Sequence, residues 1–143
     1  MKNKPLNEMK LQIPALPENE SLARACVTQF VSRADPTVSE LADIRCAVSE
    51  AVTNCVVHAY KDKGGIIYIN ARLYAGRKVT LTVADKGCGI PDIALAMTPL
   101  YTTDKENERS GMGFAIMQSF SDRIKVTSKP GAGTKVFMEK YLK

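Results

Sequence analysis

Apolar and polar residues either alternate or recur at helical spacing in successive segments of this chain. Strict alternation predicts β-strands at Met9–Ile13, Gly65–Tyr74, Lys78–Ala84, Arg123–Ser128 and Thr134–Tyr141. Apolar residues three and four positions apart predict helices from Asn19 or Ser21 to about Ala34, from Thr37 to Tyr60, around Ile93–Met97, and from Phe114 through Phe120. Glycine-containing turns join the last four strands into two hairpins. This order predicts an α+β fold, an α/β sandwich whose helices cover one face of a mixed but mainly antiparallel sheet.

The first predicted helix has one apolar stripe and an arginine that lies off it. We expect Asn19 or Ser21 to cap this helix, and the stripe to consist of Leu22, Cys26, Phe30 and Val31. Arg24 falls outside the stripe, so its guanidinium group is available to a partner protein. A solvated helix residue is the ordinary alternative for Arg24.

The long helix from Thr37 to Tyr60 has two different faces, and Thr37 with Glu40 gives it a capping-box start. One face is an apolar stripe of Leu41, Ile44, Val48, Val52, Cys55 and Ala59. On the other face Glu50 and Asn54, four residues apart, project together. An amide oxygen can bind hydrated Mg²⁺ while a neighbouring carboxylate takes a proton from a nucleophile. A solvated polar face is the ordinary alternative for such a pair, so other motifs must decide.

A second candidate site follows the strand Lys78–Ala84. The sequence there reads Asp85-Lys86-Gly87-Cys88-Gly89. A carboxylate at a strand end can accept a hydrogen bond from a ligand, and two glycines let the backbone fold tightly against it. A loop that merely needs two glycines remains the alternative.

The segment from Thr98 to Gly113 is polar, charged and without a period, which predicts a lid or a disordered loop. Its end, Ser110-Gly111-Met112-Gly113, runs directly into an apolar helix. Glycines at a helix start expose backbone amides to a phosphate chain, and the helix dipole assists. The dinucleotide-binding fingerprint does not fit, because Ile116 occupies the position of its third glycine. The Walker pattern is also absent from the sequence.

Composition restricts the class of protein further. A chain of 143 residues with 45% hydrophobic content predicts a single domain, residues 1–143, with a real core. We expect a cytoplasmic protein that does not enter a membrane, because no segment approaches the run of about 18 apolar residues that a span needs. The four cysteines show no C-x-x-C spacing, which favours reduced thiols over a metal site or disulfides. The net charge of +5 suits an acidic partner or a polyphosphate, whereas the scattered lysines and arginines do not favour nucleic acid.

Four motifs in this order resemble the GHKL ATPase superfamily, which includes gyrase, Hsp90, MutL and histidine kinases. They are E-A-V-T-N on a helix, D-K-G-C-G after a strand, S-G-M-G-F at a helix start, and G-T after a glycine turn. Within the superfamily the chain is most similar to the small anti-sigma-factor serine kinases of spore-forming bacteria, from about Met9 to Tyr141. The resemblance implies the Bergerat ATP-binding fold with an ATP lid, and ATP and Mg²⁺ as cofactors.

The same resemblance implies a role for individual residues. Glu50 is the general base, Asn54 the Mg²⁺ ligand, Asp85 the acceptor for the adenine amino group, and Arg109 a lid residue that meets the γ-phosphate. The other implied nucleotide-binding residues are Gly87, Gly89, Thr102, Thr103, Ser110, Gly111, Met112, Gly113 and Thr134. Two positions depart from the family pattern, Ala59 and Lys86, and we expect neither to touch a motif residue.

The resemblance also implies partners. They are a sporulation sigma factor of the sigma F type, a STAS-domain antagonist whose serine accepts the phosphoryl group, and a second copy of the chain in a homodimer. Arg24 is implied as a contact shared by sigma factor and antagonist. The alternatives are a non-catalytic ATP-gated binding module, a kinase that controls a stress-response sigma factor, and a detached histidine-kinase domain. Glu50 favours an enzyme, since a pure binding module needs no base there.

Overall fold

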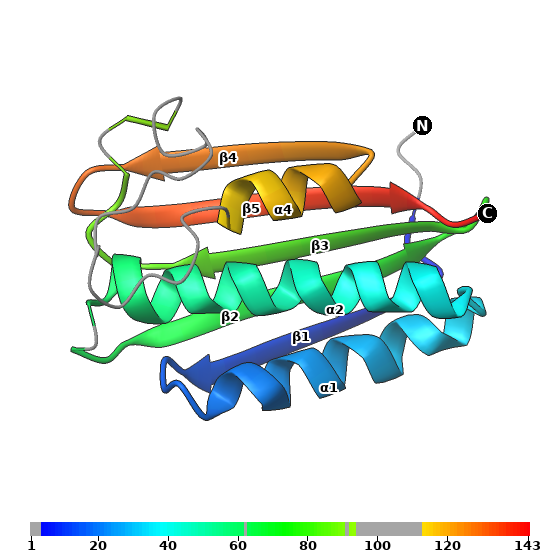
Figure 1. Cartoon of the computed structure of the whole chain (residues 1–143), viewed down its shortest axis with the longest axis horizontal. Helices are drawn as coiled ribbons and strands as arrows, with labels where there is room; N and C mark the ends of the chain where they lie inside the picture. The colour runs from blue at the N-terminus through cyan, green and yellow to red at the C-terminus, as the bar shows by residue number, and fades with distance from the viewer. Residues whose placement is uncertain (1–3, 62, 91, 94–112) are drawn as a thin grey trace.

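The computed structural model describes residues 4–61, 63–90, 92–93 and 113–143. The elements follow in the order β1 (Asn7–Pro14), α1 (Asn19–Val31), a 3₁₀ turn (Ser32–Ala34), α2 (Val38–Thr53), the π-helix η2 (Asn54–Ala59), β2 (Ile66–Tyr74), β3 (Lys78–Asp85), α4 (Gly113–Phe120), β4 (Arg123–Lys129) and β5 (Gly133–Tyr141). The strands form one five-stranded sheet in the order β1-β2-β3-β5-β4. In Figure 1 the helices α1, α2 and α4 lie on one face of this sheet. The predicted α+β sandwich is confirmed, and every pairing between the described strands is antiparallel.

Strand alternation produces a continuous apolar layer under the helices. One row of residues in register crosses all five strands, and it consists of Leu11, Ile69, Val83, Val136 and Val126. Neighbouring positions along each strand point to the opposite face of the sheet. A slip by one residue would therefore expose the whole apolar set, so burial fixes the register.

The long helix begins as the sequence predicts and ends differently. The Thr37 hydroxyl accepts from the Glu40 amide at 3.1 Å, and the Thr37 amide donates to Glu40 Oε1 at 2.9 Å, which completes the capping box. Of the predicted stripe, Ile44, Val48, Val52 and Cys55 are buried, whereas Leu41 and Ala59 are only partly so. From Asn54 onward the winding is π-helical, and the Tyr60 amide reaches the Cys55 carbonyl five residues back, at 3.0 Å. Wide turns of this kind occur frequently at functional sites.

The predicted stripe of the first helix is confirmed at Phe30 and Val31, whereas its first half is wrong by one position and the predicted cap is also wrong. Ala23 and Val27 are fully buried and pack in the core with Phe30 and Val31, while Leu22 is 46% exposed. Both sets of positions have helical spacing, so the sequence alone does not choose between them. The small side chain of Ala23 lets α1 approach its neighbours closely. The N-cap is Glu18 without a side-chain bond, and Asn19 Nδ2 instead donates to the Pro14 carbonyl at 2.9 Å.

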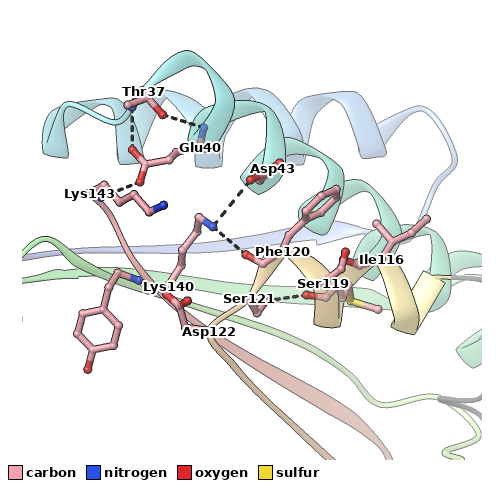
Figure 2. A network of polar contacts seen from close by, with 12 residues as sticks. Thr37, Glu40, Asp43, Ile116, Ser119, Phe120, Ser121, Asp122, Lys140 and Lys143 are labelled. Atoms are coloured by element: carbon pink, nitrogen blue, oxygen red, sulfur yellow. Dashed lines mark hydrogen bonds and ion pairs between the residues drawn. The ribbon is translucent and has the colours of Figure 1, made fainter.

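The C-terminal end of the chain, from Lys140 in β5 to Lys143 after it, contacts the ends of two helices, as Figure 2 shows. The Lys143 amide donates to Glu40 Oε2 at 2.8 Å, next to the start of α2. Lys140 Nζ donates to the Phe120 carbonyl at the end of α4, at 3.1 Å, and lies 3.8 Å from Asp43 Oδ2 of α2. This network fixes α2 and α4 relative to the sheet at one end of the molecule.

Two predicted segments fall largely outside the described residues. The helix around Ile93–Met97 has only Ile93 within them, and the lid Thr98–Gly113 has only Gly113, which opens α4. Among the helices that the structure does describe, none combines the length and apolar character of a membrane span.

Glu40→Ala is expected to lower the free energy of unfolding at neutral pH by about 1 to 3 kcal/mol, because the backbone amides of Thr37 and Lys143 lose their acceptor. These hydrogen bonds hold the pKa of Glu40 below its ordinary value. Their contribution is therefore present above the ordinary glutamate pKa and disappears as the pH falls through the lowered pKa. Denaturant unfolding at neutral and acidic pH gives the free energy of unfolding of the wild type, of Glu40→Ala and of the exposed control Ser39→Ala. A stability difference that does not change with pH contradicts it.

Candidate functional site

Three elements each have one end at the same edge of the molecule, on the left in Figure 1. Strand β3 ends at Asp85, α2 passes into η2 at Asn54, and α4 begins at Gly113. Packing of α2 against α4 and of η2 against β3 brings these ends together. The turn between β4 and β5 lies at this edge as well, since Asp85 pairs with Thr134 in the sheet register. The edge therefore gathers residues from every motif that the structure describes.

Asp85 is a buried carboxylate with donors from three segments, and it is only 8% exposed. Its Oδ1 atom accepts from the Gly87 amide at 2.9 Å and from the Thr134 amide at 3.2 Å. Its Oδ2 atom accepts from the Cys55 thiol, with Sγ at 3.6 Å. Burial raises the pKa of Asp85, and the three hydrogen bonds oppose that rise by favouring the ionised form. The side chain is thus a fixed hydrogen-bond acceptor at the end of a central strand.

The loop after Asp85 is held tightly between η2 and the β4–β5 turn. A Cβ atom on Gly87 would lie 2.4 Å from the Ala59 carbonyl oxygen, and one on Gly89 would lie 2.2 Å from the Lys129 carbonyl oxygen. Gly89 also has a φ of 77°, which side chains rarely adopt. The loop therefore needs glycine at both positions. The expectation that Ala59 touches no motif residue is wrong, because it packs directly against Gly87 and its carbonyl accepts from the Cys88 amide at 2.9 Å.

Glu50 and Asn54 lie one turn apart where α2 becomes η2, and both are half-buried. In the described part of the chain the Asn54 side-chain nitrogen is buried without a hydrogen-bond partner. Buried polar atoms rarely remain so unless a ligand or water completes them, and this NH₂ group can donate to a ligand oxygen, such as that of a phosphate. Among the described residues no group of three or more His, Cys, Asp or Glu side chains can hold a metal ion.

A family model described as the histidine kinase-like ATPase domain matches residues 13–140, which include every site residue above. The chain belongs to this family. Within it the chain falls in the group of anti-sigma F factors. It is 52% identical over 136 residues to the anti-sigma F factor of Thermoanaerobacter sp. (strain X514), which covers 95% of this chain and 94% of the relative. It is 51% identical over 134 residues to that of Clostridium acetobutylicum, which covers 94% and 93%.

Solved structures show the same fold at lower identity. The RsbU and RsbW domains of a Mycobacterium tuberculosis protein match with a TM-score of 0.70 at 21% identity, over 96% of this chain and 33% of that one. A blue-light activated histidine kinase of Erythrobacter litoralis matches with a TM-score of 0.57 at 23% identity, over 91% and 62%. These structures show the fold, and the family model over residues 13–140 confirms the resemblance to the GHKL superfamily drawn from the four motifs.

The structure brings together most of the predicted site residues that lie within its described part. Asp85 accepts hydrogen bonds from the amides of Gly87 and Thr134 and from the thiol of Cys55, the residue that follows Asn54. Gly89 lies in the same loop, close to the Lys129 carbonyl. Gly113 opens α4 as predicted. Thr102, Thr103, Arg109, Ser110, Gly111 and Met112 lie outside the described residues, and their roles stay predictions.

Arg24 is far from this group in the chain and is not available in the way that the sequence suggested. Its Nη1 atom lies 3.2 Å from Glu20 Oε1 and 3.4 Å from Ser49 Oγ. The side chain thus bridges α1 to the turn of α2 that precedes Glu50. The Arg24 side chain is still 35% exposed, so a partner would compete with these two contacts for the guanidinium group.

Three residues of this ATPase fold were missed by sequence reasoning. Cys55 was assigned only to an apolar stripe. The Tyr60 hydroxyl donates to the Ile66 carbonyl and accepts from the Lys86 amide, both at 2.7 Å, and burial raises its pKa. The Ser128 hydroxyl accepts from the Ile90 amide at 2.7 Å and contacts Thr134 Oγ1 at 2.9 Å. None of the three carries a local signal, because each partner lies on another element.

Gly89→Ala is expected to destabilise the protein more than Gly76→Ala does, although both glycines have a φ of 77°. Gly76 faces open space, so its substitution adds only backbone strain of about 1 to 2 kcal/mol. At Gly89 the new Cβ also displaces the Lys129 carbonyl, which adds about 1 to 3 kcal/mol. Denaturant unfolding of both variants gives the difference. Equal losses would show that the contact with Lys129 does not constrain the loop.

Proposed function

We propose that this protein is an anti-sigma factor that binds and inhibits a sporulation sigma factor of the sigma F type. We further propose that it acts as an ATP-dependent protein serine kinase, which phosphorylates and thereby inactivates a STAS-domain antagonist. The observation that carries the proposal is the identity of about half of all positions with anti-sigma F factors over nearly their whole length. The geometry around Asp85, Asn54 and Glu50 supports the chemical part.

Asp85 suits recognition of adenine. Its carboxylate can only accept hydrogen bonds when ionised, and adenine presents an exocyclic amine where guanine presents a carbonyl oxygen. The Oδ1 atom already has two backbone donors, so Oδ2 is the atom with acceptor capacity to spare. Gly87 and Gly89 let the adjoining backbone pack closely against Ala59 and Lys129, which keeps the loop folded beside Asp85.

The phosphate end of the nucleotide suits the start of α4 and the end of α2. The first backbone amides of a helix have no intrahelical acceptors and favour an anion, so Gly113 and the residues before it would bind phosphate oxygens. Arg109 of the predicted lid would add a positive charge. Asn54 would hold Mg²⁺, which when bound orients the phosphates and neutralises their charge. Glu50, one turn earlier, would take the proton from the serine hydroxyl of the antagonist.

A homodimer is part of the proposal. No described helix covers the second face of the sheet, opposite α1, α2 and α4 (Figure 1). The residues there include Tyr68 and Phe137, which neighbour the buried Ile69 and Val136 and so point away from them. They lie among mostly polar and charged side chains, which include the ion pair between Glu8 and Arg72, so this face would offer a second copy both apolar and polar contacts.

Glu50→Gln is expected to retain ATP affinity and to reduce phosphoryl transfer by about 10² to 10⁴, since the amide keeps the size of the side chain but cannot accept the proton. Incubation with γ-labelled ATP and the STAS-domain antagonist, with ATP affinity measured by calorimetry, separates the two effects. Glu18→Gln, on the exposed approach to α1, is the control. Transfer near the wild-type rate would remove Glu50 as the base. No transfer by the wild type despite tight ATP binding would favour an ATP-gated binding module.

Arg24→Ala is expected to weaken binding of both sigma factor and antagonist by about tenfold or more, as for an arginine in the centre of an interface. Glu20→Ala is the matched control, because it removes the same ion pair within α1 but keeps the guanidinium group. Surface plasmon resonance with each partner measures the two variants, and calorimetry checks that ATP affinity is retained. If Glu20→Ala weakens the partners as much as Arg24→Ala, the effect comes from the structure of α1 and not from a direct contact.

A further inference from the structure

The thiol of Cys55 is directed at the carboxylate assigned above to adenine. Cys55 is 3% exposed, and its Sγ atom lies 3.6 Å from Asp85 Oδ2. The two residues are separated by 30 positions in the chain, so this contact depends on the docking of η2 against the end of β3. Asp85 and Cys55 form a buried pair in which only the thiol can donate when the carboxylate is ionised.

The hydrogen bonds around Asp85 leave its carboxylate few free acceptor sites for a ligand. Each carboxylate oxygen has about two acceptor sites. On Oδ1 both are occupied by the backbone amides of Gly87 and Thr134, at 2.9 and 3.2 Å. On Oδ2 the thiol of Cys55 occupies one, so the described residues leave one acceptor site for one N–H group of a ligand.

The position of Cys55 makes the thiol a fixed donor. It directly follows Asn54 at the start of η2, and its carbonyl accepts from the Tyr60 amide at 3.0 Å, which holds the π-helical turn. This bond holds the backbone of Cys55, and the surrounding packing of the side chain, which is 3% exposed, keeps Sγ beside Asp85. A water molecule in the same place can turn, and can donate as readily as it accepts.

We propose that Cys55 is a specificity-determining positioning residue of the nucleotide site, whose thiol orients Asp85 and leaves one acceptor site for the exocyclic amine of a 6-aminopurine. The inference rests on the proposed function, in which Asp85 reads the base. Without the thiol, water fills the space and can donate to the oxygen of a 6-oxopurine. Selectivity between 6-amino and 6-oxo nucleotides then declines, although Asp85 itself is retained.

A purely structural role predicts a different result. Buried cysteines commonly behave as small apolar side chains. In that case replacement would change stability, and would change the affinity for all nucleotides equally. The ratio of two affinities separates the roles, because a general loss of folding or of site shape cancels in it.

The experiment compares ATP with inosine triphosphate, which carries an oxygen where adenine carries the amine. Calorimetry on the full chain gives both affinities for wild type, Cys55→Ala, Cys55→Ser and Val56→Ala, where Val56 is a neighbouring residue that is also 3% exposed. Cys55→Ala is expected to reduce the ratio of ATP to inosine triphosphate affinity about threefold to tenfold, the worth of one hydrogen bond. Cys55→Ser keeps a donor and is expected to restore the ratio, while Val56→Ala leaves it unchanged. An unchanged ratio in Cys55→Ala, or an equal loss in Cys55→Ser or Val56→Ala, overturns the inference.

A second measurement does not depend on the folding of the alanine variant. Infrared spectroscopy of the wild type detects S–H stretching bands, and the band that Cys55→Ser lacks belongs to Cys55. ATP is expected to shift this band, because a new donor on Oδ2 weakens the bond from the thiol, whereas inosine triphosphate shifts it less. A band that ATP leaves unmoved overturns the inference.

The ATP affinities of the wild type and of Asp85→Asn are measured first, because they test the assignment of Asp85. If the wild type binds no ATP, or if Asp85→Asn binds ATP as tightly as the wild type, the assignment of Asp85 fails and this inference fails with it. If both controls behave as proposed and the Cys55→Ala ratio is unchanged, only the role of Cys55 is refuted.

Discussion

The burial of one carboxylate at the end of a central strand is the constraint on which this edge of the molecule depends. An ionised carboxylate without partners is very costly to remove from water, so Asp85 requires donors. They come from its own loop, from β5 and from η2, through Gly87, Thr134 and Cys55. Because the three donors belong to segments far apart in the chain, the carboxylate is satisfied only when strand, turn and helix end have all docked.

The helix α2 connects this edge to the opposite end of the molecule. Its first turn carries the capping box with Glu40, and its last turn carries Glu50 beside Asn54. Lys143, just after the last strand, holds α2, and Lys140 within that strand holds α4 (Figure 2). The two helices are therefore fixed far from the candidate site, while their other ends meet there. Such an arrangement lets a site be positioned accurately by contacts that never touch a ligand.

Local chemistry explains which parts of the fold were predictable. Each hairpin consists of two strands that follow one another in the sequence and pair antiparallel through a turn that contains glycine. Alternation and the turn residues were therefore sufficient to predict both hairpins. The capping box needs only Thr37 and Glu40, three residues apart. The apolar stripe of α1 was displaced by a position, because Leu22 and Ala23 both fit a helical period and only the closeness of neighbouring elements selects the smaller one. The π-helical turn after Asn54 has no signature in the residues themselves.

The sequence by itself determined the antiparallel architecture, the family, and the motif residues Glu50, Asn54, Asp85, Gly87 and Gly89, since each belongs to a short local pattern. Tertiary structure alone decided what surrounds them. It placed Ala59 against Gly87, turned the Tyr60 hydroxyl to the Lys86 amide, and directed the Cys55 thiol at Asp85. The physical reason is that hydrogen bonds and van der Waals contacts act over a few ångströms in space, whereas periodicity records only neighbours along the chain. A cysteine in an apolar stripe looks the same in sequence whether it faces a valine or a carboxylate.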